Sequence, residues 1–263
     1  MAGIARPSQQ TVKQTGQITQ EQAGGHSELP VIYRPMAWED LQDLVVGYDQ
    51  TWGQYALADD RDQGLLVARY FVLHYLERAS QGEVAYQGDK FLGVILTRVV
   101  GQPPAFPQAK GELAQTRQFL EANDKGRQLI QVTDYWHRIE SEMEDQISAN
   151  ERDQAEVELF MVAAAARGRG VGGGLWGRLH ARLEGQGVER FYLHTDSTCD
   201  VSFYRHKGLE QSISRMAADH GEDRAAIGED LDDLYIYEDT ISPGQGQSAS
   251  SAEGTPGHDD RQA

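Results

Sequence analysis

Cysteine, long apolar runs and basic residues are all scarce in this sequence of 263 residues, and each scarcity excludes a class of protein. A single cysteine, Cys199, allows no internal disulfide and no multi-cysteine zinc or iron–sulfur site. The longest uninterrupted apolar run, 159–166, falls far short of the ~18–20 residues that cross a bilayer. The first residues lack the continuous apolar core of a secretory signal. We therefore expect a cytoplasmic protein with no membrane partner.

Basic side chains are outnumbered by acidic ones, with 24 Lys plus Arg against 41 Asp plus Glu and a formal net charge of −17. Such a charge repels phosphate backbones and argues against a nucleic-acid partner. Acids are densest between Asp219 and Asp239, where nine acids and one arginine, Arg224, give a local charge of −8. We expect a solvated loop there, in front of the last strand.

Two polar tails flank the apolar part of the chain. Residues 1–30 and 242–263 are rich in Gln, Thr, Gly and Ser and hold almost no large apolar side chain. Segments of this composition bury too little surface to offset the entropy lost on ordering. We expect both tails to be disordered, which leaves one domain, 31–241, with a helical insertion at 103–154.

Hydrophobic periodicity predicts the elements of that domain. A strand and two helices come first, then a hairpin that turns at Gly88, the insertion, and a β-α-β-α-β-β series. This order describes an α/β fold around a mixed sheet. The expected strands are 31–34, 83–86, 91–100, 156–162, 188–194, 209–216 and 234–237, and the expected helices are 38–52, 65–79, 171–183 and 199–206.

The insertion carries a long amphipathic pattern, which favours a helix lying on the domain. A dimer seam and the wall of a binding cleft are the alternatives, with Trp136 or Tyr135 lining the cleft. A monomer and a homodimer both remain compatible with the sequence. The apolar positions are Leu129, Val132, Trp136, Ile139, Met143 and Ile147, and the opposite face is expected to carry Arg138, Glu140, Glu142, Glu144 and Asp145.

Glycines crowd the turn between the strand 156–162 and the following helix, in the stretch from Arg167 to Gly174. The first N–H groups of a helix have no partner within it, so they form a site for an anion such as a phosphate. The GxxxxGK[ST] pattern of a P-loop is absent from the sequence. A GxGxxG pattern is present and makes a dinucleotide-binding enzyme an alternative. Residues 163–167 separate it from the strand, however, and fewer than 100 residues follow it.

A second pattern in the same turn, Arg167-x-x-Gly170-x-Gly172 after Val162, resembles the coenzyme-A motif of the GNAT family of N-acetyltransferases. The family's later motif is matched at Phe203, Tyr204 and Gly208, whereas Ser197, Asp200 and Leu209 depart from its commonest residues. The resemblance covers 31–102 and 155–240. It implies a mixed central sheet with helices on both faces, and acetyl-CoA or another acyl-CoA as the donor for an amine acceptor.

The resemblance also implies where the donor binds. The pyrophosphate would lie on the backbone of the glycine-rich turn, and the pantetheine arm would pair with the preceding strand at Met161 and Val162. The turn positions are Arg167, Gly168, Arg169, Gly170, Val171, Gly172 and Gly173.

Acyl transfer to an amine needs a base and an acid. Glu156 and Glu158 lie two apart on one strand, hence on one face unless a bulge intervenes. Either could act as the base, directly or through a water, and burial beside Phe160 would raise its pKa. The resemblance favours Glu158, because many family members carry an acid four residues before the position of Val162, whereas Glu156 fits the spacing of the histone-acetylating branch. The resemblance places Tyr204 beside the coenzyme sulfur, and its phenol is a suitable proton donor for the departing thiolate. A structural ion pair and a core tyrosine are the respective alternatives.

Other chemistries have weaker support in the sequence. Cys199 is either a small buried residue or a reactive thiol, and no paired base for it is evident. His180, His194, His206 and Asp196 form no convincing metal site, so we expect no metal. The alternative to a solvated loop at 219–239 is a segment beside the cleft that attracts a cationic acceptor, such as a polyamine, an aminoglycoside or a basic peptide. The alternative function is a non-catalytic module that binds or senses acyl-CoA.

Overall fold

The structure, a computed structural model, describes residues 29–53, 61–228 and 231–241. The strands are β1 (Val31–Pro35), β2 (Gln81–Gln87), β3 (Lys90–Val99), β4 (Ala155–Val162), β5 (Arg190–Asp196), β6 (Glu210–Arg215) and β7 (Leu234–Thr240). The helices are α1 (Leu41–Trp52), α2 (Arg61–Arg78), α3 (Ala109–Glu121), α4 (Asp124–Ile147), α5 (Ala149–Arg152), α6 (Val171–Gly185), α7 (Val201–Lys207) and α8 (Gly221–Ile227). The two expected tails lie outside the described residues, apart from Leu29 and Pro30.

The predicted α/β fold is confirmed, as a seven-stranded sheet in the order β1-β2-β3-β4-β5-β7-β6. Neighbouring strands run antiparallel except β4 and β5, which are parallel. The hairpin of β2 and β3 turns at Gly88, whose φ of 59° lies in the left-handed region that glycine adopts without strain. The mixed sheet therefore has one parallel pair, at its centre.

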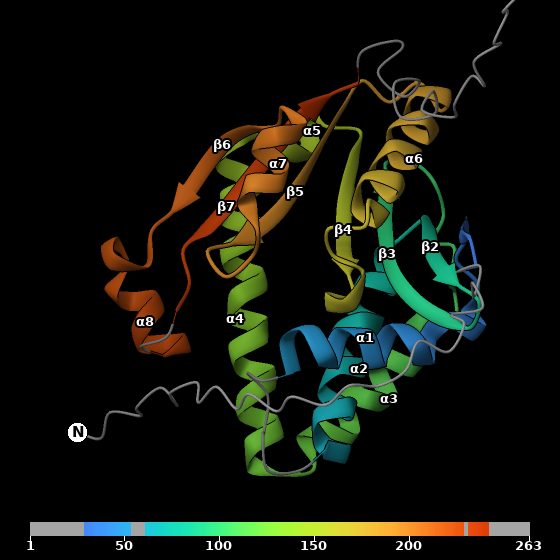
Figure 1. Ribbon diagram of the computed structural model, residues 1–263. Coiled ribbons are helices and arrows are strands. Elements are labelled where there is room, and N and C mark those ends of the chain that lie inside the picture. The colour runs from blue at the N-terminus through green and yellow to red at the C-terminus, as the bar shows by residue number, and fades with distance from the viewer. Residues whose placement is uncertain (1–28, 54–60, 229–230, 242–263) are drawn as a thin grey trace, which may run out of the picture.

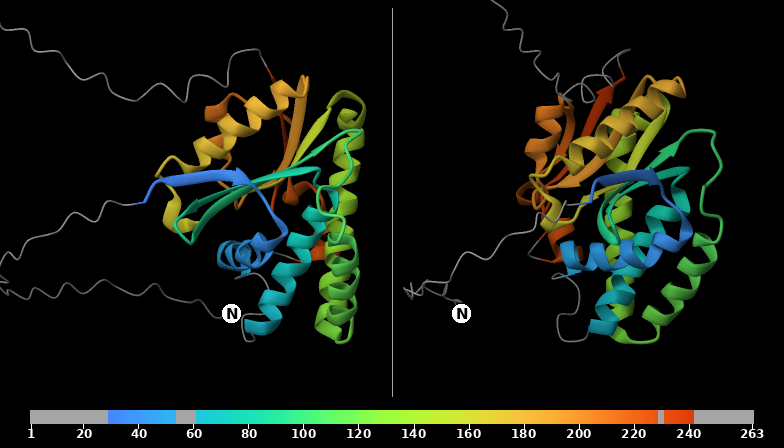
Figure 2. Two further views of the ribbon diagram at one scale, coloured as in Figure 1. Left: turned by 90° about the vertical axis from the view of Figure 1, so that its right-hand side faces the viewer. Right: turned by 45° about the vertical axis from the view of Figure 1, so that its right-hand side comes forward.

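Helices cover both faces of the sheet, as Figures 1 and 2 show. On one face α6 and α7 pack over a core that includes Leu175, Trp176 and Phe191. On the other face α1 and α2 bury Leu44 and Leu73 against β3 and β4. Side chains on successive strand residues point to opposite faces, so each strand contributes to both cores.

Two helices of the expected insertion pack on the second face, beside α2. Val67 and Tyr70 of α2 meet Leu120 of α3 and Ile130 of α4 in one cluster. Further along, α4 buries Ile139 and Met143 against the β5 and β7 half of the sheet. Helix α4 thus reaches from the α1 and α2 layer to the other half of the sheet (Figure 1).

The acidic segment 219–239 is not the solvated loop that we expected. Residues 221–227 form α8, and Asp223 is buried, where it pairs with Arg215 and accepts a hydrogen bond from Tyr135 of α4 at 2.9 Å. Part of the segment is therefore helical, and one of its acids, Asp223, has partners in the fold. Among the described helices, none combines the length and the apolar character that crossing a membrane requires.

Candidate active site

The sheet opens at its centre because β4 and β5 pair over only three residues. Ala155, Glu156 and Val157 face Phe191, Tyr192 and Leu193, and the pairing between these two strands ends there. β4 continues to Val162 paired with β3 alone. Its other backbone edge is therefore open beyond Val157, where an extended ligand can take its hydrogen bonds.

A cavity of about 670 Å³ lies along this open edge and reaches the glycine-rich turn. Gly168 and Gly170 have φ values of 74° and 79°, which glycine adopts readily, and Gly170 is the N-cap of α6. Of the residues expected to bind the donor, all but Arg169 line this cavity: Met161, Val162, Arg167, Gly168, Gly170, Val171, Gly172 and Gly173. Arg169 instead donates to the side chain of Gln87 at 3.1 Å.

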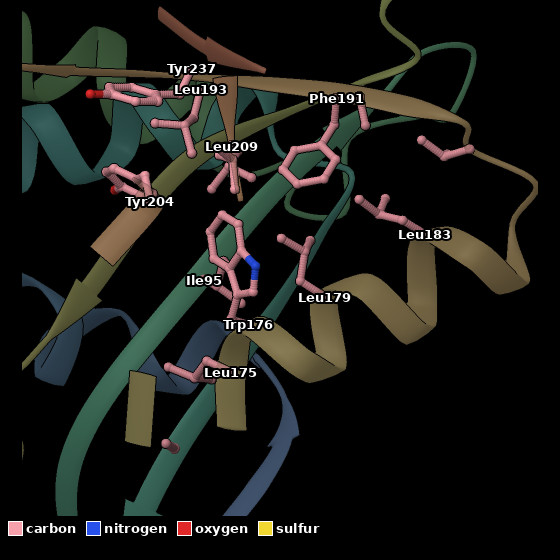
Figure 3. Close-up of a cluster of buried hydrophobic side chains, with 14 of the residues drawn as sticks. Ile95, Leu175, Trp176, Leu179, Leu183, Phe191, Leu193, Tyr204, Leu209 and Tyr237 are labelled. Carbon is pink, nitrogen blue, oxygen red and sulfur yellow. The ribbon is translucent and has the colours of Figure 1, made fainter. Parts of the chain in front are cut away.

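Helix α6 is held in place by its close fit to the sheet. A Cβ atom on Gly174 would lie 2.2 Å from the Tyr33 hydroxyl of β1, so only glycine allows this approach. Figure 3 shows Trp176, Leu179 and Leu183 pointing from α6 into the core beside Phe191 and Ile95. The helix N-terminus is consequently fixed at the end of the cavity, with its unpaired N–H groups in the first turn.

A second cavity, of about 330 Å³, lies on the other side of the opening between α1, α2, α4 and the two strands. Its wall includes aromatic side chains: Tyr48 and Trp52 of α1, Phe71 and Tyr75 of α2, and Trp136 of α4. It also includes polar side chains: Glu158 of β4 and His194, Thr195 and Asp196 of β5. Trp136 thus lines a cleft wall as the sequence suggested, whereas Tyr135 contacts α8.

The two cavities share part of their walls. Trp52, Phe160, Thr198, Cys199 and Tyr204 line both. A group held in one cavity can therefore meet a group held in the other only across this shared wall, at the point where β4 and β5 part.

Tyr204 belongs to that shared wall and is 9% exposed. Its ring packs against Trp176, Phe203 and Tyr237, with centroids 5.7–5.9 Å away. Burial raises the pKa of the phenol well above its usual value, and the nearby acids Asp196 and Asp200 add to the shift. The side chain is therefore a protonated phenol at neutral pH.

Glu156 and Glu158 face the same side of the sheet and share two arginines. Arg78 of α2 lies 3.0 Å from Glu156 and 3.2 Å from Glu158, and Arg98 of β3 contacts both carboxylates, at 3.0 Å for Glu158. Tyr192 donates a hydrogen bond to Glu156. The ion-pair alternative is thus present, and it includes both candidates for the base.

A register shift opposite Leu96 and Thr97 in β3 leaves Glu158 as an extra residue in β4. A bulge of this kind re-aims one side chain of the strand. Phe160 consequently packs on the α6 face against Trp176 and Phe203, with centroids 5.5 and 5.2 Å away. The interpretation that Phe160 shields Glu158 on the same strand face was wrong.

The two acids differ in access to the second cavity, since Glu158 lines it and Glu156 is not among its lining residues. Burial and the neighbouring Glu156 raise the pKa of Glu158 to about 8, against the opposing effect of Arg78 and Arg98. A carboxyl group with a pKa in this range can exchange a proton near neutral pH.

Sequence reasoning missed a group of polar residues that supports the second cavity. Glu140 and Glu144 were expected on the solvent face of α4, which is wrong. Glu144 is 7% exposed and lies 2.9 Å from His194 Nε2, and Glu140 accepts a hydrogen bond from Trp136 Nε1 at 3.2 Å. The signal was available, because Trp136, Glu140 and Glu144 follow one another at four-residue spacing and so share a face.

His194, which the sequence did not assign to a site, is half-buried beside these acids. Burial lowers the pKa of the imidazole, but Glu144, Glu140 and Glu156 outweigh that effect and raise it to about 9. The hydrogen bond from His194 correspondingly lowers the pKa of Glu144 to about 2, although burial alone would raise it. His194 and Glu144 therefore form a charged pair between β5 and α4.

Ligand atoms of Glu144, Glu156 and His194 all lie within 4.8 Å of one another, a spacing that a metal ion could bridge. Each of these groups already has protein partners, namely Asn150, Tyr192, Arg78 and Arg98 in addition to the pair itself. Two guanidinium groups beside Glu156 also oppose a further cation. We assign the group as an ion-pair network.

Cys199 is half-buried in the wall shared by the two cavities. Burial and the neighbouring Asp196 raise the pKa of its thiol. The protonated thiol is a poor nucleophile, so the position is close to the site without supporting a covalent route.

Comparison with known proteins identifies a family that this chain matches. A family model described as "Acetyltransferase (GNAT) family" matches residues 38–209. No curated protein matches the chain.

Solved structures with a similar fold include an agmatine N-acetyltransferase (11% identity, 80% of this chain and 99% of the other, TM-score 0.49). An N-acetyltransferase from Staphylococcus aureus has 15% identity over 81% of this chain and 99% of its own, with a TM-score of 0.45. An IAA acetyltransferase from Bacillus cereus has 14% identity over 81% and 100%, with a TM-score of 0.42.

Proposed function

The chain belongs to the acetyltransferase (GNAT) family, and from that premise we propose that it is an acetyl-CoA-dependent N-acetyltransferase. The acyl group passes directly from the coenzyme-A thioester to the amine of a small molecule or peptide. The observation that carries the proposal is the pair of cavities that meet where β4 and β5 part, with Tyr204 in the shared wall and Glu158 in the wall of the second cavity.

The first cavity suits the donor. The open edge of β4 at Met161 and Val162 can pair with the amide groups of a pantetheine arm. The N-terminus of α6 offers N–H groups to a pyrophosphate, and Arg167 adds positive charge in the cavity wall. At Gly168, Gly170 and Gly173 an added Cβ would meet no protein atom within 4 Å, so the space beside the backbone is open to a ligand.

The second cavity suits the acceptor and the removal of its proton. Glu158 accepts a proton from the ammonium group of the acceptor, which frees the nitrogen lone pair to attack the thioester carbonyl carbon. The C–N bond forms as the C–S bond breaks. Tyr204 gives its phenolic proton to the departing sulfur and is restored by the proton lost from the nitrogen or by solvent. Atoms and charge balance, with an amide and a free thiol as products.

The donor site is tested by one glycine substitution with a control in the same helix. We expect Gly173→Ala to raise the KM for acetyl-CoA at least about tenfold, because a methyl group would stand where the pyrophosphate approaches the backbone. Gly185→Ala is the matched control, since its added Cβ likewise meets no atom within 4 Å but lies at the far end of α6. Both substitutions should preserve or raise thermal stability, because alanine favours a helix over glycine.

The measurement is release of the coenzyme-A thiol with a panel of amines, together with direct binding of acetyl-CoA. Equal KM values for the two variants would contradict the proposed donor site. Tight acetyl-CoA binding without thiol release across the panel would favour the alternative, a non-catalytic acyl-CoA-sensing module.

A further inference from the structure

Glu158, the proposed base, has no partner in either strand beside it in the described sheet. The register of β4 with β3 passes from Val157 directly to Leu159. The pairing of β4 with β5 ends at Val157. A residue at such a bulge is left out of the ladder, and its side chain is aimed differently from its neighbours. The position of the Glu158 carboxylate therefore depends on the side chains that contact it.

Two arginines contact this carboxylate, and both use the same pair of nitrogen atoms. The Nε atoms of Arg78 on α2 and Arg98 on β3 lie 3.2 and 3.0 Å from Glu158 Oε1. The Nη2 atoms of the same two guanidinium groups contact Glu156 Oε2, at 3.0 Å for Arg78. Each guanidinium group thus spans both carboxylates along one edge, and a planar fork of this kind fixes orientation as well as charge.

The two carboxylates are placed differently in this arrangement. Glu158 Oε2 takes no part in the four contacts with the arginines, and Glu158 lines the second cavity. Oε2 is therefore the oxygen of Glu158 that remains for an ammonium group in that cavity. Glu156 is 4% exposed, and its Oε2 accepts a further hydrogen bond from the Tyr192 hydroxyl at 3.1 Å.

Charge in the group balances because Glu156 is present. Burial lowers the pKa of both arginines, but Glu156 and, to a smaller extent, Glu158 outweigh that effect and raise it. Glu156 is thus the main counter-charge of the two guanidinium groups. Without it, Glu158 would face two cations alone, which favours the charged form of the carboxyl group and makes it a weaker base.

Other titratable groups surround Glu158, so the effect of Glu156 has to be measured as a difference. The charged groups come from α4, from β5 and from the residues before β7: Glu140, Glu144, His194, Asp196 and Asp232. Burial raises the pKa of every tyrosine in the cavity wall and of Cys199, and it lowers that of His137 to about 4. A substitution at position 156 leaves all of these side chains in the protein.

Building on the proposed N-acetyltransferase function, we propose that Glu156 is the positioning residue of the base: it acts through Arg78 and Arg98, and Glu158 alone takes the proton of the acceptor. Glu156 holds the two guanidinium groups in place and offsets part of their charge. Glu158 consequently keeps Oε1 on the arginines, presents Oε2 to the acceptor and remains basic enough to accept a proton.

The first experiment follows the titration of Glu158 directly, in the full chain and without an acceptor. Carbon-13 NMR of the side-chain carboxyl groups in glutamate-labelled protein gives the pKa, and the signal lost in Glu158→Gln identifies the residue. We expect Glu156→Gln to lower the pKa of Glu158 by at least about one unit, because two cations then face one carboxylate. Glu156→Asp keeps the charge and should recover most of this difference.

Glu83→Gln is the matched control. Glu83 of β2 is 5% exposed and likewise contacts two arginines, Arg178 and Arg182 of α6, on the other face of the sheet. Its replacement removes a buried carboxylate from two guanidinium groups and should leave the pKa of Glu158 unchanged.

A second comparison keeps the test independent of a folding defect in Glu156→Gln. In the double variant Glu156→Gln/Arg98→Gln, Glu158 faces Arg78 alone and the charges balance. The pKa of Glu158 should be at least about one unit lower in the double variant than in Arg98→Gln, since the two proteins differ only at position 156.

The second experiment measures the consequence for the reaction. It uses the amine with the fastest thiol release among 2-phenylethylamine, 1,4-diaminobutane, spermidine and a short peptide with an N-terminal amine. Glu156→Gln should raise the ratio of kcat/KM at pH 6 to that at pH 9 at least about fivefold, because a base with a lower pKa is ionised at lower pH. A purely structural defect lowers both values and leaves the ratio unchanged, and titration of the amine is common to both proteins.

The outcomes separate the inference from the function on which it rests. An unchanged pKa of Glu158 in both comparisons, an equal fall in Glu83→Gln, or an unchanged pH ratio overturns the inference and keeps the N-acetyltransferase. A lowered pKa of Glu158 in Glu156→Gln, with no acetyl transfer from the original protein to any of the four amines, overturns the proposed function and keeps the coupling of the two acids through the arginines.

Discussion

Tyr204 and Glu158, the proposed acid and base, illustrate how burial acts on two different titratable groups. Both are withdrawn from water, and burial raises the pKa of both groups. For a phenol the shift keeps the proton in place until a strong base appears. For a carboxyl group it brings the titration close to the pH of the cell. Burial thus favours the proposed role of Glu158 as a base and keeps Tyr204 protonated, while it makes the phenol a weaker acid than a free tyrosine.

Replacing Tyr204 by phenylalanine keeps the ring contacts with Trp176 and Tyr237 and removes the proton donor. We expect kcat to fall at least about tenfold, with the KM for acetyl-CoA nearly unchanged. Tyr235→Phe on the neighbouring strand is the control and should leave kcat unchanged. Full activity in Tyr204→Phe would remove the phenol from the mechanism.

The proposed role of Glu158 predicts a pH dependence with a defined sign. The base acts when deprotonated, and its pKa is raised to about 8, so kcat/KM should rise with pH and level off above about 8. Glu158→Gln should lower kcat/KM about 10²-fold or more. It should also remove the rise of kcat/KM with pH that comes from Glu158 and leave only the rise that comes from deprotonation of the amine substrate. Titration of the acceptor is common to both proteins.

Exposed Glu39→Gln is the control for this profile, and it should match the original protein at every pH. If the Glu158→Gln profile keeps the same shape, another group or a water chain is the base.

At the scale of elements, α4 is the link between the two halves of the sheet. It packs against α2 and α3 at one end and against β5 and β7 further along. Its Glu144 meets His194 of β5 beside the second cavity, the proposed acceptor site. The helix α4 therefore both packs the two halves of the sheet together and forms part of the cavity wall.

The ion pair of Glu144 and His194 predicts how the free energy of unfolding depends on pH. The pKa of His194 rises from 6.5 to about 9 on folding, so its stabilisation is complete below about 6.5 and is lost as pH rises through about 9. The pKa of Glu144 falls from 4.5 to about 2, so its contribution is present above about 4.5 and is lost as pH falls through about 2.

Urea unfolding at pH 6.5 and 9.5 tests this sign. We expect the free-energy difference between the original protein and His194→Gln to shrink by about 1–3 kcal/mol between these two pH values. His206→Gln, on the exposed side of α7, should show no such change. Parallel pH profiles for the original protein and His194→Gln would contradict the pair's contribution.

For the whole molecule, local pattern predicted the elements and their order, because apolar periodicity records which side of each element is buried. The glycine-rich turn could also be predicted, because its glycines and the start of the following helix are adjacent in the sequence. The pairing of Glu144 with His194 could not, because the two residues are 50 apart in the sequence. Asp223 was missed for the same reason, with Tyr135 on α4 as its distant partner.

The gap between β4 and β5 has a consequence for the order of events in the proposed reaction. The proposed donor cavity follows the glycine-rich turn and the start of α6, and the proposed acceptor cavity lies among α1, α2, α4, β4 and β5. Neither ligand has to pass through the place of the other, and neither product has to leave before the second substrate arrives. Initial rates would follow a random sequential scheme, with intersecting double-reciprocal lines, in which the two substrates are held at once.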